Sequence, residues 1–227
     1  MIDIRPYEKR FERDLVEICW RTGFMGESLE GTGRFEDKRL FALIFALSFP
    51  RFEPGSCFVA VDEKEGEPAS SARAVGYILG SADAAAQAEY FSRRFAPRIA
   101  ARAFLYDSWR HPESLKQVLC FLRGSHKADD PSRPESATVP SPDCPACLHT
   151  NLLPAYQNRG LGTKLMRTYL DALRARGIPG VYLETSDRNH KALPFYKKMG
   201  FQLLREEPGE FWLAAPAKAL TFVQKLR

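Results

Sequence analysis

The amino-acid sequence predicts an α/β domain, because strand-like and helix-like segments alternate through its C-terminal half. Compact apolar runs at residues 147–153 and 181–185 are typical of strands. Between them, residues 162–176 carry an apolar stripe at helical spacing, and Gly177 follows where a helix commonly ends on glycine. A second helical segment, 189–199, follows the second strand. This order indicates a sheet with helices packed on it.

The N-terminal half fits the same class. Residues 2–5 alternate before a proline, and two later segments show helical spacing or an apolar helix-like run. The elements that we expect are a first strand at 2–5, helices at 7–21 and 37–48 joined by a glycine-rich loop at 23–33, and a hairpin of strands at 57–61 and 74–80.

The middle of the chain interrupts this pattern. We expect helices at 84–103 and 112–123, followed by a long surface loop at 124–145 that holds five of the sixteen prolines. Closing strands are expected at 201–205 and 221–226, with a turn at 207–209. The chain is therefore predicted to be one domain, 1–227, in which 83–146 is an insertion and 147–206 is the core.

Composition excludes several classes of protein. The net charge of +5, from 33 basic and 28 acidic residues, is mild and includes no long basic run, so nucleic-acid binding is not expected. No stretch reaches the roughly 18–20 apolar residues of a membrane span. The first residues lack the apolar segment of a signal peptide, and the odd number of scattered cysteines argues against a disulfide framework. We expect a reduced, soluble protein of the cytoplasm, with the nucleus left open.

Cys144, Cys147 and His149 suggest a metal site, but their number is too small. A structural zinc site needs about four ligands, and no second cysteine pair lies at a suitable spacing. No metal is predicted.

Residues 152–163 join the end of an expected strand to the start of an expected helix. A helix N-terminus offers backbone N–H groups without intrahelical partners and the positive end of the helix dipole. Gly160 and Gly162 allow close approach of phosphate oxygens, while Arg159 and Lys164 add positive charge. The spacing fits neither the Walker loop nor the dinucleotide-binding fingerprint. A phosphate-binding turn is favoured, although this segment alone leaves open a tight turn without a ligand.

Two signatures, in order, make the sequence resemble a known family. Residues Gln157-Asn158-Arg159-Gly160-Leu161-Gly162 resemble the Gln/Arg-x-x-Gly-x-Gly/Ala signature of the GNAT superfamily of N-acetyltransferases. Residues 189–201 resemble its second signature, N-x-x-A-x-x-F-Y-x-x-x-G-F. Residues 143–154 are also similar to the subgroup related to the acetyltransferase-like domain of O-GlcNAc hydrolases, where a histidine would be expected near Cys147.

The resemblance implies a mixed, mostly antiparallel sheet that splays around an acetyl-CoA cofactor, with helices on both faces. Strand amides would pair with the pantetheine arm, N–H groups at the helix start would bind the pyrophosphate, and an asparagine would lie beside the arm. The residues implied in cofactor binding are Leu152, Leu153, Gln157, Asn158, Arg159, Gly160, Leu161, Gly162, Thr163, Asn189 and Tyr196.

The resemblance also implies catalytic roles. Tyr196 would be the general acid that protonates the leaving thiolate; the alternative is a core aromatic on an amphipathic helix. Because substrate amines are mostly protonated at pH 7, a base or a water chain must remove a proton. His149 has a suitable ordinary pKa near 6.5, and Glu184 is its rival. Asn151 could orient a water.

The function that we expect is direct transfer of an acetyl group from acetyl-CoA to a primary amine. An amino sugar, a lysine side chain and a small amine all remain open as acceptors, so the partner is a small-molecule or peptide amine, and the oligomeric state is not predicted. The alternative is an acyl-CoA-binding pseudoenzyme that acts as a sensor or scaffold.

Overall fold

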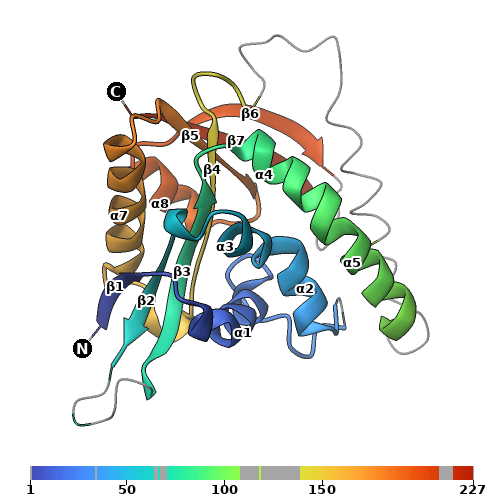
Figure 1. The fold of residues 1–227 in the computed structure, drawn as a ribbon. Helices are drawn as coiled ribbons and strands as arrows, with labels where there is room; N and C mark the ends of the chain where they lie inside the picture. The colour runs from blue at the N-terminus through green and yellow to red at the C-terminus, as the bar shows by residue number, and fades with distance from the viewer. Residues whose placement is uncertain are drawn as a thin grey trace.

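The computed structural model describes residues 2–33, 35–63, 66, 71–107, 118, 139–209 and 217–226. These residues form one seven-stranded sheet with helices on both faces (Figure 1). The predicted α/β class and the mostly antiparallel sheet are therefore confirmed.

The strand order across the sheet is β1-β2-β3-β4-β5-β7-β6. Neighbouring strands run antiparallel except β4 and β5, which are parallel. The strands are β1 (Ile2–Pro6), β2 (Cys57–Asp62), β3 (Arg73–Ser81), β4 (Ala146–Leu152), β5 (Gly180–Ser186), β6 (Gln202–Gly209) and β7 (Ala217–Lys225).

The central pair of strands separates after two residue pairs. Ala146 and Cys147 of β4 pair with Val181 and Tyr182 of β5. Beyond that point β4 continues to pair only with β3, as far as Leu152, while β5 pairs with β7. The inner edges of both strands thus face a widening gap, where unpaired backbone groups can bind an extended ligand. The predicted splay is confirmed.

Helices cover the two faces of the sheet unequally. On one face lie α1, α2, α3 and the long α4–α5 rod, whose helical turns η4 and η5 continue it; on the other lie α7 and α8 (Figure 1). Their bounds are α1 (Glu12–Thr22), α2 (Lys38–Phe45), α3 (Ser48–Phe52), α4 (Ala84–Tyr90), η4 (Phe91–Phe95), α5 (Ala96–Arg102), η5 (Ala103–Asp107), α7 (Leu161–Ala175) and α8 (Ala192–Lys198).

The sheet separates two hydrophobic cores. Tyr77 and Leu79 of β3 face the core under α1 and α2, whereas Ile78 between them faces the core under α7 and α8. This alternation follows from the two-residue period of a strand. Successive side chains along β4 or β5 therefore lie on opposite faces of the sheet.

The single helix predicted at 37–48 is wrong, because the structure divides it into α2 and α3. Asp37 caps α2 by accepting hydrogen bonds from the amides of Arg39 and Leu40. The break follows Phe45, and Pro50 explains it: inside a continuous helix its ring would clash with the carbonyl four residues earlier, at Ala46. A new helix that begins at Ser48 places the proline in its first turn instead.

The turn predicted at 207–209 is also wrong, because β6 runs through Gly209. Pro208 lies opposite Lys218 of β7. Strand β6 is the last strand in the sheet order, and an edge strand tolerates a proline because the missing N–H can face outward.

The predicted helix at 84–103 is confirmed as the α4–α5 rod. The helix expected at 112–123 lies outside the described residues except for Val118, and so does the loop expected at 124–145 except for 139–145. Among the helices that the structure describes, none is long and apolar enough to span a membrane.

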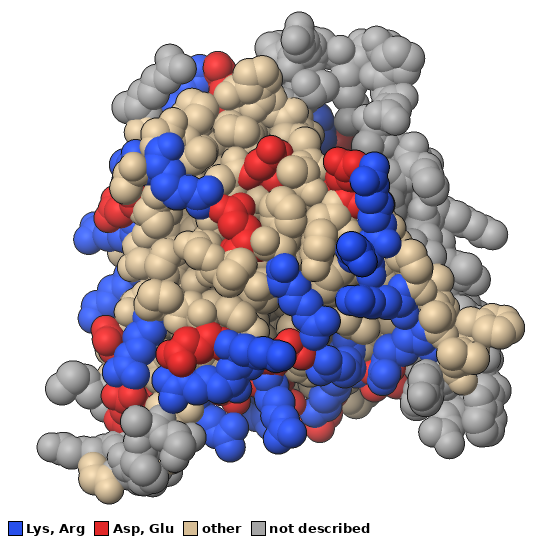
Figure 2. All heavy atoms as spheres, in the orientation of Figure 1, with Lys and Arg blue, Asp and Glu red and all other residues tan. Residues whose placement is uncertain are grey.

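The mild positive charge is spread over the surface. On the face drawn in Figure 2, Lys and Arg gather in the lower part and along the side where α5 lies, with Asp and Glu between them. This mixture of signs differs from the uniformly basic surface expected of a nucleic-acid-binding face.

Candidate active site

The strand-to-helix turn after β4 presents a helix N-terminus at the mouth of the splay. A short 3-10 turn, Pro154–Tyr156, leads to Asn158 and Gly160, which both adopt positive φ, at 59° and 77°. Gly160 is the N-cap of α7 and supplies no side-chain hydrogen bond. The first-turn amides of Leu161, Gly162 and Thr163 therefore remain available, at the positive end of the helix dipole, for an anion.

The two glycines of this turn serve different purposes. Gly160 needs its left-handed backbone, which side chains adopt only with strain. Gly162 has an ordinary φ, and a Cβ atom there would come no nearer than 3.6 Å to the ring of Phe195. Folding alone thus does not require glycine at 162. Glycine at this position leaves the backbone open to close approach by a ligand.

Side chains within the turn hold its shape. Gln157 Nε2 donates a hydrogen bond to the carbonyl oxygen of Leu152 at 2.9 Å, which closes the loop on itself. Tyr156 Oη donates to Asp62 Oδ2 at 2.8 Å and so ties the loop to the end of β2. This hydrogen bond to the carboxylate raises the pKa of the Tyr156 phenol. Gln157 therefore shapes the predicted site from within the loop.

The register of β4 distinguishes the two leucines that sequence reasoning paired with the pantetheine arm. The amide of Leu153 donates to the carbonyl oxygen of Val75 on β3 at 3.0 Å. Because backbone groups of an antiparallel strand alternate in direction, those of Leu152 point the other way, toward the splay. The amide role predicted for Leu153 is therefore wrong, and we keep it for Leu152.

Asn189 lies in the turn between β5 and α8. Its carbonyl oxygen accepts hydrogen bonds from the amides of Ala192 and Leu193, and its side-chain amide donates to Thr185 Oγ1 at 3.2 Å. These contacts fix the start of α8 at the rim of the splay. They give Asn189 a structural task in this turn.

Tyr196 is buried on α8, with 7% of its surface exposed. Its ring packs near Phe195, Phe201 and Phe222, with centroid distances of 5.7, 6.1 and 6.2 Å. Burial raises the pKa of the phenol to about 12, so the hydroxyl keeps its proton at physiological pH. Within the described part of the chain the Tyr196 hydroxyl has no hydrogen-bond partner. Its oxygen is also not fully buried, because it is absent from the buried atoms that have no partner. It can therefore donate to a ligand atom.

His149 lies on β4 beyond the point where β4 and β5 separate. Asn151 Nδ2 approaches His149 Nε2 at 3.3 Å and Tyr77 Oη at 2.9 Å. Burial lowers the pKa of the imidazole to about 4, so the ring is neutral at physiological pH. Sequence reasoning missed Tyr77 because it stands 74 positions from Asn151 on another strand. The available signal was the His-x-Asn spacing, which puts two side chains on one face of a strand.

Glu184 lies on β5 beyond the same point. Cys147 and Tyr182 are direct partners in the parallel ladder, so His149 and Glu184, each two residues further on, share one face of the sheet. That face carries α1 and α2. The Glu184 side chain is 61% exposed, and Arg205 Nη2 lies 3.9 Å from its carboxylate.

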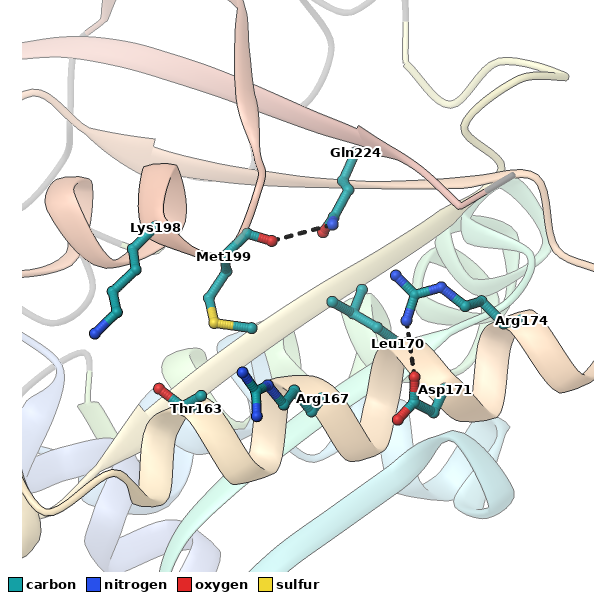
Figure 3. Close-up of a pocket in the computed structure, with 8 residues that line it drawn as sticks. All are labelled: Thr163, Arg167, Leu170, Asp171, Arg174, Lys198, Met199 and Gln224. Carbon is teal, nitrogen blue, oxygen red and sulfur yellow. Dashed lines mark hydrogen bonds and ion pairs between the residues drawn. The ribbon is translucent and has the colours of Figure 1, made fainter.

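A groove of about 350 Å³ lies between α7 on one side and α8 and β7 on the other, and it begins near the first turn of α7 (Figure 3). Arg167 and Arg174 of α7 lie on one side of it, and Lys198 of α8 lies on the other. Arg174 is paired with Asp171 at 2.7 Å. The residues that line the groove are Thr163, Arg167, Leu170, Asp171, Arg174, Lys198, Met199 and Gln224. Its positive charge adds to that of the helix N-terminus.

The cysteines and their neighbours form no metal site in the described part of the chain, where no cluster of three metal-ligating side chains occurs. Cys19, Cys57, Cys144 and Cys147 are free and buried. Burial raises the pKa of the Cys147 thiol to about 12, which disfavours the thiolate that binds metals.

Comparison with known proteins supports the signatures. Residues 127–201 match the model of the acetyltransferase (GNAT) family. The N-alpha-acetyltransferase RimI of Mycobacterium tuberculosis is 49% identical over 49 residues, 22% of this chain and 29% of that protein. N-alpha-acetyltransferase 30 of Schizosaccharomyces pombe is 39% identical over 46 residues, 20% of this chain and 31% of that protein. The chain thus spans less than a third of the length of these curated relatives.

Solved structures match over the whole chain. The crystal structure of SsHAT is 29% identical with a TM-score of 0.73, over 100% of this chain and 98% of that one. The structure of Arabidopsis thaliana NAA60 in complex with acetyl-CoA is 15% identical with a TM-score of 0.52, over 99% and 98% of the two chains. The second likeness concerns the fold alone. Its two signatures, the matched segment 127–201 and its fold make the chain similar to the GNAT superfamily of acetyltransferases.

Proposed function

We propose that this protein transfers an acetyl group from acetyl-CoA to a primary amine. The observation that carries the proposal is the uncapped N-terminus of α7 at the mouth of the β4–β5 splay. It joins an anion-binding helix end to a gap lined by unpaired strand edges. A pyrophosphate followed by a long amide-containing arm has the chemistry to occupy both.

Different residues of the chain would bind different parts of the cofactor. The amides of Leu161, Gly162 and Thr163 would hold the pyrophosphate, with Asn158 and Arg159 beside it. The backbone N–H of Leu152, whose carbonyl oxygen already accepts from Gln157, would pair with the pantetheine arm. Acetyl-CoA supplies the activated thioester. The basic groove along α7 begins at Thr163, and it would hold the 3′-phosphate through the positive charge of Arg167 and Lys198.

Tyr196 would donate a proton or a hydrogen bond to the leaving sulfur. A phenol ordinarily has a pKa about 1.5 units above that of a thiol, which costs about 2 kcal/mol for full proton transfer. Burial raises the pKa of the phenol to about 12, and a thiolate leaving into the same apolar surroundings would be destabilised in the same sense. The difference between the two groups therefore stays small enough for Tyr196 to assist departure.

Glu184 is the better placed of the two candidate bases. Its carboxylate is exposed on the face of α1 and α2, where an acceptor can approach, and Arg205 lies 3.9 Å from it. His149, in contrast, has a pKa lowered to about 4 by burial, and its Nε2 atom already contacts Asn151. We therefore propose that Glu184 accepts the proton of the acceptor amine.

The finer kinship with the subgroup related to O-GlcNAc hydrolases is part of this proposal. It rests on residues 143–154, which here form the approach to β4 and the strand itself. Cys147 stands where that subgroup is expected to carry a histidine. The thiol is buried beside Tyr182 at the point where the strands separate.

The test is release of free CoA thiol from acetyl-CoA in the presence of an amino sugar, a lysine-containing peptide and a polyamine. At least one amine should give amine-dependent release with an amide product, and Glu184→Gln should slow it. Tight CoA binding without release for any amine would contradict the proposal and favour the pseudoenzyme alternative.

A further inference from the structure

A series of hydrogen bonds links His149 through the partly buried Asn151 to the buried Tyr77 and Cys19. Asn151 Nδ2 lies 2.9 Å from Tyr77 Oη and 3.3 Å from His149 Nε2. Tyr77 is fully buried and shares a hydrogen bond with Cys19 of α1. This series of hydrogen bonds therefore runs from α1 across β3 to β4, and His149 is its last member.

The contact of Asn151 Nδ2 with His149 Nε2 favours one tautomer of the imidazole. The side-chain amide nitrogen of Asn151 has two hydrogens, so it can donate to Tyr77 Oη and to His149 Nε2 together. A ring nitrogen that accepts carries no proton. The hydrogen of the neutral ring must then be on Nδ1.

His149 Nδ1 ends this series of hydrogen bonds, and it faces accessible space. In the described part of the protein, His149 Nδ1 has no hydrogen-bond partner. The polar atoms that are both fully buried and without a partner do not include it. It must therefore keep contact with solvent. The side chain lies on the same face as Glu184, beyond the point where β4 and β5 separate.

The surroundings keep the ring neutral. Burial lowers the pKa of His149 to about 4, and an N–H group aimed at Nε2 opposes a second ring proton. Burial also raises the pKa of Tyr77 on β3 and that of Cys19 on α1, so both keep their protons. Charged groups on this face include Glu184 of β5, which is exposed, and Arg205 of β6, which lies 3.9 Å from the Glu184 carboxylate and 3.0 Å from that of Glu207.

We propose that Asn151 is a positioning residue, which fixes His149 as a neutral Nδ1–H donor for the carbonyl oxygen of the bound acyl group. This rests on the proposed acetyl transfer. When an amine attacks the thioester, negative charge develops on that oxygen, and a neutral imidazole can stabilise the charge without giving up its proton. His149 is thus a hydrogen-bond donor of the site, and the base is another group.

The first experiment reads the tautomer of the full-length protein by two-dimensional 1H–15N NMR of its four histidines, with His149→Gln to assign the signal. His149 should be neutral from pH 5 to 8, with its hydrogen on Nδ1. Asn151→Ala should lose this preference. Thr150→Val is the matched control, because it removes a neighbouring hydrogen bond to the Tyr77 carbonyl and leaves Asn151 in place. It should keep the wild-type tautomer.

The second experiment uses Asn151→Asp, whose carboxylate accepts from Nε2–H and so moves the hydrogen away from Nδ1. Its kcat should fall about 10²-fold at high pH, the usual loss for one oxyanion donor. Below the raised pKa of its imidazole, both nitrogens carry hydrogen, so the ratio of variant to wild-type kcat should recover as the pH falls. A structural defect alone would give no such recovery.

Two results would overturn the proposal. One is a wild-type His149 that titrates near 6.5 or carries its hydrogen on Nε2. The other is a His149→Ala variant that turns over at the wild-type rate. The NMR result does not depend on turnover, so an absence of acetyl transfer would reject the proposed function while leaving the tautomer assignment measurable.

Discussion

Valine at position 162 should weaken cofactor binding without unfolding the protein. Gly162 is the second residue of α7, its φ is ordinary, and a Cβ atom there meets only the ring of Phe195 at 3.6 Å. Valine and glycine differ by less than about 0.5 kcal/mol in helix propensity. The branched side chain would, however, fill the space through which phosphate oxygens reach the backbone amides.

The size of the effect follows from the hydrogen bonds at stake. A hydrogen bond to a charged group contributes about 1.5–3 kcal/mol, so the loss of one amide–phosphate bond should weaken CoA binding about 10- to 100-fold. Gly162→Ala is the matched control. Its methyl group is small, the family signature accepts alanine here, and the change should raise stability by about 0.5–1 kcal/mol, or about 1–4 °C in Tm.

Gly160 gives the opposite pattern. Its φ of 77° means that Gly160→Ala should cost about 1–2 kcal/mol of stability, or about 2–8 °C in Tm. Calorimetric titration with CoA and thermal melting would measure both properties for all three variants. Wild-type CoA affinity in Gly162→Val, with an unchanged melting curve, would refute the reasoning.

Three further predictions concern single side chains. Tyr196→Phe should keep the fold and the CoA affinity while kcat falls about 10²- to 10⁴-fold. Because the pKa of the wild-type phenol is about 12, its ionisation should cause no loss of rate below about pH 11. A variant with wild-type kcat would remove Tyr196 from the mechanism. Burial lowers the pKa of His149 in the folded protein to about 4, whereas its ordinary value is 6.5. As the pH falls from 6.5, the unfolded chain therefore takes up a proton that the folded protein does not, and the free energy of unfolding should drop by at most about 3 kcal/mol by pH 4. Chemical denaturation at both pH values should show a smaller drop in His149→Gln, and an equal drop would count against this assignment. Glu53→Ala should cost about 3 kcal/mol in urea unfolding, because the carboxylate accepts from Arg176 at 2.5 Å and from the amide of Ala82 at 2.9 Å; a change below 1 kcal/mol would show that these groups find other partners.

Glu53 also adds an acid-sensitive contribution to stability. Burial raises the pKa of its carboxyl, but hydrogen bonds from Ser56 and Arg176 outweigh burial and lower it overall. A depressed carboxyl pKa stabilises the folded state above the unfolded value, near 4.5, and the stabilisation is lost as the pH falls through the folded value. It therefore acts below the pH range in which His149 acts.

Local periodicity was enough to predict most elements of the fold. The apolar stripe of α7 and its terminal Gly177 depend on neighbours three or four residues apart, which the sequence displays directly. The break between α2 and α3 was missed because the run from Leu40 to Phe49 is apolar except for Ser48, and this pattern alone does not show the effect of Pro50. The extension of β6 through Pro208 was missed because it requires knowing that this strand lies at the edge of the sheet.

The candidate site shows the same division. The cradle around Gly160 could be predicted because its signature is contiguous. That Leu153 is committed to Val75 follows only from the pairing of β3 with β4, which a single sequence does not reveal. The contact of Asn151 with Tyr77 likewise joins residues 74 positions apart, so the neutral state of His149 depends on an arrangement that only the folded chain provides.

Hydrogen–deuterium exchange with and without CoA tests the central claim most directly, because it reports which backbone amides the cofactor covers. Saturating CoA should slow exchange at the amides of Leu152 and of residues 158–163, and leave the far edge of the sheet at β1 unchanged. If CoA binds and these amides exchange at their free rates, the cofactor lies elsewhere, and the placement of acetyl transfer in the β4–β5 splay is contradicted.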